Sequence, residues 1–108
     1  MVTVSVDSIT VGIEGTETEI PITYSLEQNY PNPFNPRTTI HFTVPQNNQV
    51  ALKIFDVMGK EVATLINEEK SEGNYEIEFN ATNLPSGIYF YQLRAGSFNQ
   101  TKKMLLLK

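Results

Sequence analysis

The 108-residue sequence contains no cysteine, no tryptophan and a single histidine, His41. Because it lacks cysteine, the chain cannot form a disulfide, a thiolate nucleophile or a cysteine-ligated zinc site. One imidazole is too few for a histidine-based metal cluster, so we expect neither a metal nor a cofactor. No apolar run approaches the roughly 20 residues that a membrane-spanning helix needs, so we also expect no integral membrane segment.

Groups that catalyse reactions are scarce as well. The two aspartates, Asp7 and Asp56, are far apart in the sequence, and His41 lies in a strand-like stretch on the face predicted to meet solvent. Glu76 and Glu78 stand two residues apart, a spacing that is more typical of a solubilised strand face than of a catalytic pair. The sequence therefore predicts a domain that is not an enzyme.

Residues that favour strands dominate the composition. Val, Ile, Thr, Tyr and Phe together number 39, whereas Ala, Leu and Met number 15. β-Branched and aromatic side chains fit a pleated sheet and lose rotamer freedom in a helix. The composition therefore favours an all-β fold over a helical bundle.

Strict alternation of apolar and polar residues indicates strands that bury one face. Turn-forming residues recur about every 8–12 positions, which predicts an immunoglobulin-like antiparallel β-sandwich of about seven strands. Six expected strands span residues 38–44, 50–57, 60–66, 74–80, 88–94 and 98–107, and the seventh comes from residues 24–30 or from residues 2–13. The expected core contains Ile40, Phe42, Leu52, Ile54, Ile77, Phe79 and Phe90, with Tyr89 and Tyr91 on the opposite face.

Charge and composition divide the chain at residue 23. Residues 1–27 hold five acids and no base, and residues 14–23 are polar, threonine-rich and interrupted by Gly15 and Pro21. We therefore interpret residues 1–23 as an acidic linker or the tail of a preceding domain, and residues 24–108 as one domain.

The opposite end of the chain is basic. The last fifteen residues carry four bases and no acid. Such an end could contact nucleic acid or an anionic membrane, but a terminal strand edge kept soluble by lysine explains it better. No nucleic-acid partner is therefore expected.

A proline-rich segment opens the domain. Pro31, Pro33 and Pro36 fix φ and cannot donate backbone hydrogen bonds, and each restrains the residue before it to an extended conformation. Asn32 and Asn35 precede two of these prolines and can cap local turns with their side chains. We expect a rigid, irregular loop or sheet edge here, not a central strand.

Four sequence strings extend this interpretation. They are YSLEQNYPNPFNPRTTIHFTVP, VALKIFDVMGKEVATL, LPSGIYFYQLRAG and TKKMLLLK, in this order along the chain. In these strings and their spacing, the chain resembles the type A C-terminal sorting domains of the type IX secretion system of Bacteroidota and their relatives. The resemblance covers residues 24–108 and leaves residues 1–23 uncovered.

The resemblance implies a non-catalytic, immunoglobulin-like tag at the C-terminus of a secreted protein. Such a tag directs a covalently attached N-terminal cargo from the periplasm across the outer membrane, to the cell surface or the extracellular medium. Its implied partners are the type IX secretion translocon and a surface sortase-like protease. The implied sorting signal is Lys102, Lys103, Met104, Leu105, Leu106, Leu107 and Lys108, and the family motif positions are Pro31, Asn32, Pro33, Phe34, Asn35, Pro36, Asp56, Gly59, Gly87 and Tyr89.

Two other classes of module stay open at this point. An adhesion or carbohydrate-binding domain needs a solvent-facing aromatic row or a metal site, and core or interface packing explains the aromatic residues 89–91 better. A structural spacer needs neither feature. An apolar terminal strand flanked by lysines offers backbone donors, side-chain contacts and charge, which suits recognition by an export machine.

Overall fold

The computed structural model describes residues 22–108 and confirms an all-β fold of antiparallel strands, with no helix in this part of the chain. The seven strands are β2 Ser25–Leu26, β3 Arg37–Val44, β4 Asn48–Phe55, β5 Glu61–Lys70, β6 Gly73–Asn80, β7 Gly87–Ala95 and β8 Phe98–Leu106. The seventh strand of the prediction is thus β2, next to Tyr24. The alternative strand at residues 2–13 and most of the expected linker at residues 14–23 lie outside the described residues.

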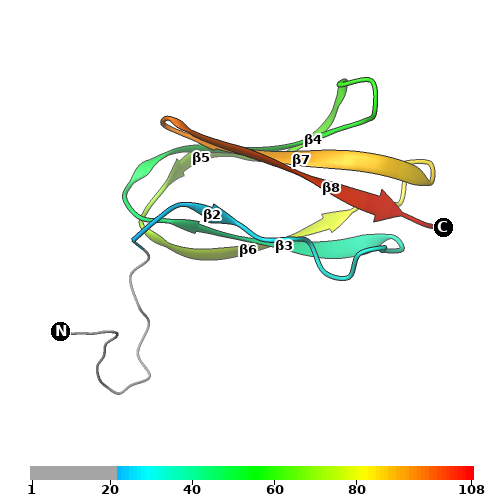
Figure 1. Ribbon diagram of the computed structural model, residues 1–108, viewed down its shortest axis with the longest axis horizontal. Coiled ribbons are helices and arrows are strands. Elements are labelled where there is room, and N and C mark those ends of the chain that lie inside the picture. Colours follow the sequence, from blue (N-terminus) through cyan, green and yellow to red (C-terminus); the bar gives the residue numbers. More distant parts are fainter. Residues whose placement is uncertain (1–21) are drawn as a thin grey trace, which may run out of the picture.

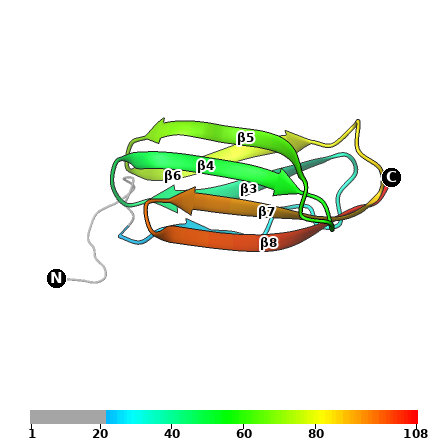
Figure 2. The ribbon, with the colours of Figure 1, turned by 90° about the horizontal axis from the view of Figure 1, so that it is seen from above.

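The strands form two sheets that face each other (Figure 1). The smaller sheet has the order β2-β3-β6 and the larger sheet the order β5-β4-β7-β8, and every pairing is antiparallel. The chain crosses between the sheets after β3, β5 and β6, and Figure 2 shows the larger sheet lying over the smaller one. This is the predicted sandwich, with β8 at one edge of the larger sheet and β5 at the other.

Apolar side chains from the two inner faces fill the space between the sheets. Full burial of one such side chain contributes about 1.5–3 kcal/mol to stability. Of the predicted core residues, Ile77 packs against the core from the edge strand β6. Five others are buried as expected, namely Ile40, Phe42, Leu52, Ile54 and Phe79.

The prediction for the aromatic run in β7 is wrong. Tyr89 and Tyr91 point inward, with 5% and 0% of their surface exposed, whereas Phe90 is half-buried on the outer face. The polar residues of β7 set this phase, because Gln92 and Arg94 alternate with Phe90 and would be buried with it. The two tyrosines can be buried in the core because each hydroxyl donates a hydrogen bond to a backbone carbonyl there.

Strand β5 is longer than predicted. The sequence indicated a short strand at residues 60–66, but β5 continues to Lys70 and pairs with the first residues of β4. The strand is exposed because it lies at a sheet edge, so its charged half stays at the surface. Lys70 pairs with Glu68 at 2.8 Å and lies over the Tyr75 ring, 5.2 Å from its centroid. Charged side chains at a sheet edge oppose pairing with another chain.

Replacing Phe79 by alanine is expected to lower the free energy of unfolding by about 3–5 kcal/mol, because the change leaves a cavity in the core. Phe79 is 4% exposed, and its ring centroid lies 6.3 Å from that of Phe34. The matched control is Phe90→Ala, which removes the same kind of side chain from the outer face and should lower the free energy of unfolding by clearly less. Denaturant unfolding of both variants measures the difference, and an equal loss would contradict this assignment of faces.

Candidate functional site

The proline-rich segment lies against the terminal strand β8, although Asn32 and Leu105 are 73 residues apart in the sequence. Residues 28–34, called the clasp below, bond the outer edge of β8. Gln28 Nε2 donates to the Lys103 carbonyl at 2.8 Å, and the Leu105 amide donates to Asn32 Oδ1 at 3.0 Å. The Phe34 amide donates to the Leu105 carbonyl at 2.9 Å, and its carbonyl accepts from Leu107 at 3.0 Å. The clasp thereby occupies a strand edge that would otherwise be open.

Phe34 fixes the clasp to the core. Its side chain is 2% exposed and packs against Phe79, and its backbone forms a parallel bridge with Leu106. Burial of a ring of this size contributes about 1.5–3 kcal/mol. Pro33 and Pro36 flank the anchor and restrict the unfolded chain, which lowers the entropy lost when the ring is placed. The segment is thus the irregular sheet edge that its prolines predict.

Tyr91 is a second anchor of the clasp. Its hydroxyl donates to the Glu27 carbonyl at 2.7 Å and accepts from the Asn29 amide at 2.8 Å. Burial raises the pKa of Tyr91 to about 12; the hydrogen bond from Asn29 opposes this increase and the charge of Glu27 adds to it. The neutral phenol therefore ties the beginning of the clasp to the middle of β7.

A buried polar cluster lies beside these anchors. Asn29 Nδ2 donates to Thr38 Oγ1 at 2.9 Å and to the Pro31 carbonyl at 3.2 Å, and Thr38 Oγ1 donates to the same carbonyl at 2.8 Å. Asn29 and Thr38 are each 2% exposed, so these bonds satisfy groups that would otherwise be costly to bury. Sequence reasoning missed both residues. Thr38 shares the phase of Ile40, which could have revealed it, but nothing local marks Asn29.

Asp56 and Gly59 form the turn between β4 and β5, and β4 ends at Phe55, two residues before the end expected for its strand. Asp56 Oδ1 accepts hydrogen bonds from the amides of Met58 and Lys60, both at 2.9 Å. Gly59 has a φ of +83°, which side-chain-bearing residues rarely adopt, and its amide donates to the Asp56 carbonyl at 3.0 Å. The turn leaves the side chains of Val57 and Met58 64% and 86% exposed.

Gly87 and Tyr89 begin β7 beside the end of β8. Gly87 pairs with Leu106 and Tyr89 pairs with Met104. The Tyr89 hydroxyl donates to the Pro85 carbonyl at 2.7 Å, which holds the loop before β7. Burial raises the pKa of Tyr89 above its usual value. Tyr89 therefore acts on the structure from inside the sandwich, whereas Gly87 contributes through its backbone pairing with β8.

The seven residues of the expected signal divide between core and surface. Met104 and Leu106 are buried, and Lys102 and Leu105 are half-buried. Lys103, Leu107 and Lys108 are exposed. The folded domain therefore presents the outward residues of β8 and the end of the chain, while the inward residues hold the strand in place.

All the motif segments meet at one end of the sandwich, called the distal end below (Figure 1). Phe34 and Gly87 both pair with Leu106. In the same part of β7, Phe90 pairs with the last residue of β4, and the Asp56 turn follows directly after that residue. The C-terminus lies at this end too, as both ribbon views show (Figures 1 and 2).

The described chain begins at the opposite, proximal end. The Thr23 carbonyl accepts a hydrogen bond from Thr43 near the end of β3, and the Tyr24 hydroxyl accepts one from Asn48 at the start of β4. The Tyr24 ring also stacks on Phe98 with a centroid distance of 5.2 Å. Whatever precedes residue 22 is therefore attached at the end remote from the motifs.

Within residues 22–108 no three acidic or histidine side chains gather as they would around a metal ion, and no segment forms a long apolar helix of the kind that crosses a bilayer. His41 bonds Glu76 at 2.9 Å on the exposed face of the smaller sheet. Shape, apolar side chains and lysines are what the distal end can present to a partner.

Phe34→Ala is expected to loosen the clasp and expose the edge of β8. The Leu105 and Leu107 amides, which donate to clasp atoms, should then exchange with solvent about tenfold faster or more relative to the amides of β4, equivalent to ~1.4 kcal/mol or more of lost protection. Hydrogen exchange followed by NMR measures this change. Tyr30→Ala is the control, because it removes a ring that is 77% exposed from the same segment. Unchanged protection in Phe34→Ala would show that the clasp does not depend on this ring.

The neutral state of Tyr91 makes the domain sensitive to alkali. The pKa of Tyr91 is about 12 in the folded protein and 10 as its ordinary value, so its contribution to stability is complete below pH 10 and is lost as the pH rises through 12. Tyr91→Phe should be less stable than wild type at pH 8 by about 1–3 kcal/mol, because it leaves buried backbone groups without a partner. Urea unfolding should show this gap narrowing above pH 10. A gap that is independent of pH would contradict the buried, neutral phenol.

Comparison with known proteins agrees with this geometry. Residues 28–107 match the family described as the secretion system C-terminal sorting domain. No curated protein and no solved structure matches the chain. The matched range covers most of the chain, begins with the clasp and ends in the terminal segment, so it contains the motifs that meet at the distal end apart from the final residue, Lys108. The chain therefore belongs to the family of secretion system C-terminal sorting domains.

Proposed function

We propose that residues 24–108 are a non-catalytic signal that carries an attached N-terminal protein from the periplasm through the outer membrane by type IX secretion. Family membership supports the sorting role and export to the cell surface or the extracellular space. The observation that carries the proposal is the clasp. It joins the first family motif to the terminal strand, so that two distant parts of the sequence form one surface.

The outward residues of the terminal strand are the part best suited to be read. Lys103, Leu107 and Lys108 are exposed, and Leu105 lies between them on the same side of β8 as Lys103. Together they offer apolar contact and positive charge at the end remote from the cargo. Met104 contributes indirectly, because its burial keeps the strand in register with β7.

The clasp determines what a partner can contact. The Lys103 carbonyl, both backbone groups of Leu105 and the Leu107 amide are already bonded to it. A partner therefore cannot add a strand along this part of β8 while the clasp is closed. The translocon would recognise the closed domain through side chains, and a surface sortase-like protease would later separate the tag from its cargo.

The test is export of a periplasmic reporter fused in front of the domain, in a host that has the type IX system. The wild-type fusion should reach the surface or the medium. The combined variant Lys102→Gln, Lys103→Gln and Lys108→Gln should export less, with little change in melting temperature. Lys103 and Lys108 are exposed and the half-buried Lys102 forms no ion pair within residues 22–108, and replacing such side chains alters stability by about 0.5 kcal/mol or less each. Lys53→Gln, Lys70→Gln and Arg94→Gln together are the control, since they remove the same charge elsewhere.

The outcomes separate two questions. A wild-type fusion that stays in the periplasm contradicts the sorting function itself. Normal export of the triple variant of residues 102, 103 and 108 contradicts the role of the terminal lysines and leaves the opening motif at Pro31–Pro36 as the signal. An equal loss in the control variant would mean that total charge, and not its position, matters.

A further inference from the structure

Exposed apolar side chains gather at the distal end, beyond the terminal strand. Of the six large apolar residues that are strongly exposed within residues 22–108, four lie there: Val57, Met58, Ile88 and Leu107. Clusters of exposed apolar side chains mark interaction sites, whereas single ones are ordinary. The turn at residues 56–59 and Ile88 lie outside the terminal signal, so a role in that signal does not explain why their apolar side chains are exposed.

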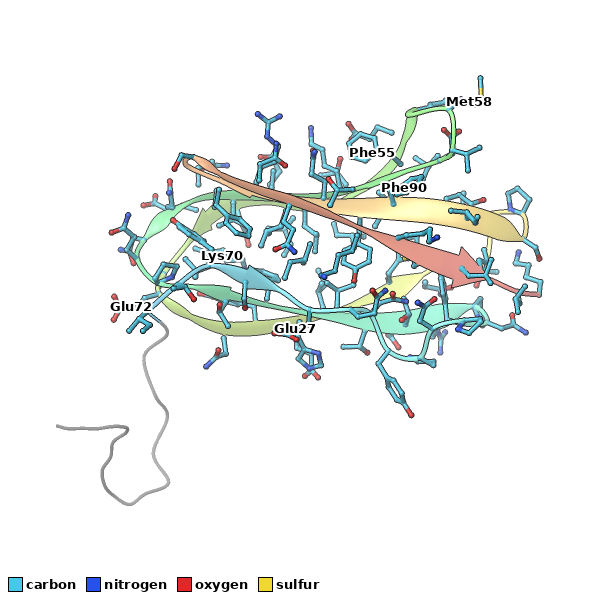
Figure 3. The ribbon with its side chains drawn as sticks, in the orientation of Figure 1. Glu27, Phe55, Met58, Lys70, Glu72 and Phe90 are labelled. Carbon is cyan, nitrogen blue, oxygen red and sulfur yellow. The ribbon has the colours of Figure 1, made fainter. Side chains whose placement is uncertain are left out.

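This apolar surface continues over the outer face of the larger sheet. Phe55 pairs with Phe90, and Ile88 pairs with Leu105. Figure 3 shows Phe55 and Phe90 on the outer side of the larger sheet and Met58 on the turn that rises above it. Further from the distal end, the face becomes polar at the row Lys53, Gln92 and Thr101. The distal patch is defined by Phe55, Val57, Met58, Ile88, Phe90 and Leu105.

Positive charge borders the distal patch. Lys103 pairs in register with Phe90, and Lys60 closes the turn; within residues 22–108 neither takes part in an ion pair. The carboxylates nearby already have partners. Asp56 accepts the turn amides, and Glu61 bonds Lys53 and Thr64. Hydrogen bonds do not cancel the charge of these carboxylates, but Lys53, Lys60 and Lys103 outnumber Asp56 and Glu61. The border is therefore net positive and complementary to an acidic partner surface.

We propose that the distal patch is a second docking surface for the export machinery, a protein surface with an apolar centre and an acidic rim. The inference rests on the proposed sorting function and extends it from the terminal strand to three neighbouring segments. The turn rises from the sheet face, so turn and face meet at an angle (Figures 1 and 3). A shaped protein surface can follow that corner, whereas a flat bilayer would reach the turn alone. The described chain begins at the proximal end, away from the patch.

The reporter fusion tests the patch with Val57→Thr and Met58→Gln combined. Both side chains point into solvent, so the melting temperature should be unchanged, whereas export should fall about fivefold or more, as expected for loss of a central apolar contact. Ile22→Gln is the matched control, because Ile22 is 90% exposed but lies at the proximal end. Full export of the Val57/Met58 variant, or the same loss in Ile22→Gln, would overturn the proposal. Failure of the sorting function is recognised separately, because the wild-type fusion would then not be exported.

A photo-crosslinking amino acid at position 58 identifies the occupant during export. We expect a covalent product with a protein of the outer-membrane export apparatus, and no such product when the same amino acid replaces Ile22. Crosslinks to lipid alone, or none, would overturn the proposal. Flotation of the purified domain with vesicles of phosphatidylglycerol and phosphatidylcholine provides an independent check, since Met58-dependent binding to these vesicles would make a membrane the occupant.

Discussion

The buried ring of Phe34 is the contact on which the distal end depends. It lies between the smaller sheet, through Phe79, and the last strand of the larger sheet, through the bridge to Leu106. Without it, the edge of β8 would be open and the proline-rich segment would have no fixed position. The prolines and asparagines around the ring arrange the backbone, but the apolar ring provides the energy that holds it.

The domain separates the residues that hold it together from those that it can display. Inward side chains of β7 and β8, such as Tyr89 and Met104, build the core. The alternate residues of the same strands, such as Phe90 and Lys103, form the outer face. A short sequence motif therefore contains residues of both kinds, and its members are expected to respond differently to substitution: the inward ones through stability and the outward ones through binding.

Sequence patterns predicted most of the fold but only part of the site. Ile40 and Phe42 could be placed in the core because they alternate with polar residues along the strand. In β7, three consecutive aromatic residues do not reveal which face is buried, and only the polar residues Gln92 and Arg94 indicate it. The Asp56 turn can be recognised in the sequence, because its hydrogen bonds join residues only two to four positions apart. The clasp cannot, because hydrogen bonds between residues 73 apart leave no local pattern, and a buried asparagine such as Asn29 has no periodicity to reveal it.

The position of β8 also sets the order in which the domain can be completed. Of the strands that the structure describes, β8 is synthesised last, yet it pairs with β7 along its whole length, supplies Met104 and Leu106 to the core and receives the clasp formed by residues 28–34. A nascent chain from which β8 has not yet emerged lacks the strand that pairs with Phe34. The sandwich is thus complete only once β8 is available, and a chain truncated before β8 would leave its opening motif unattached.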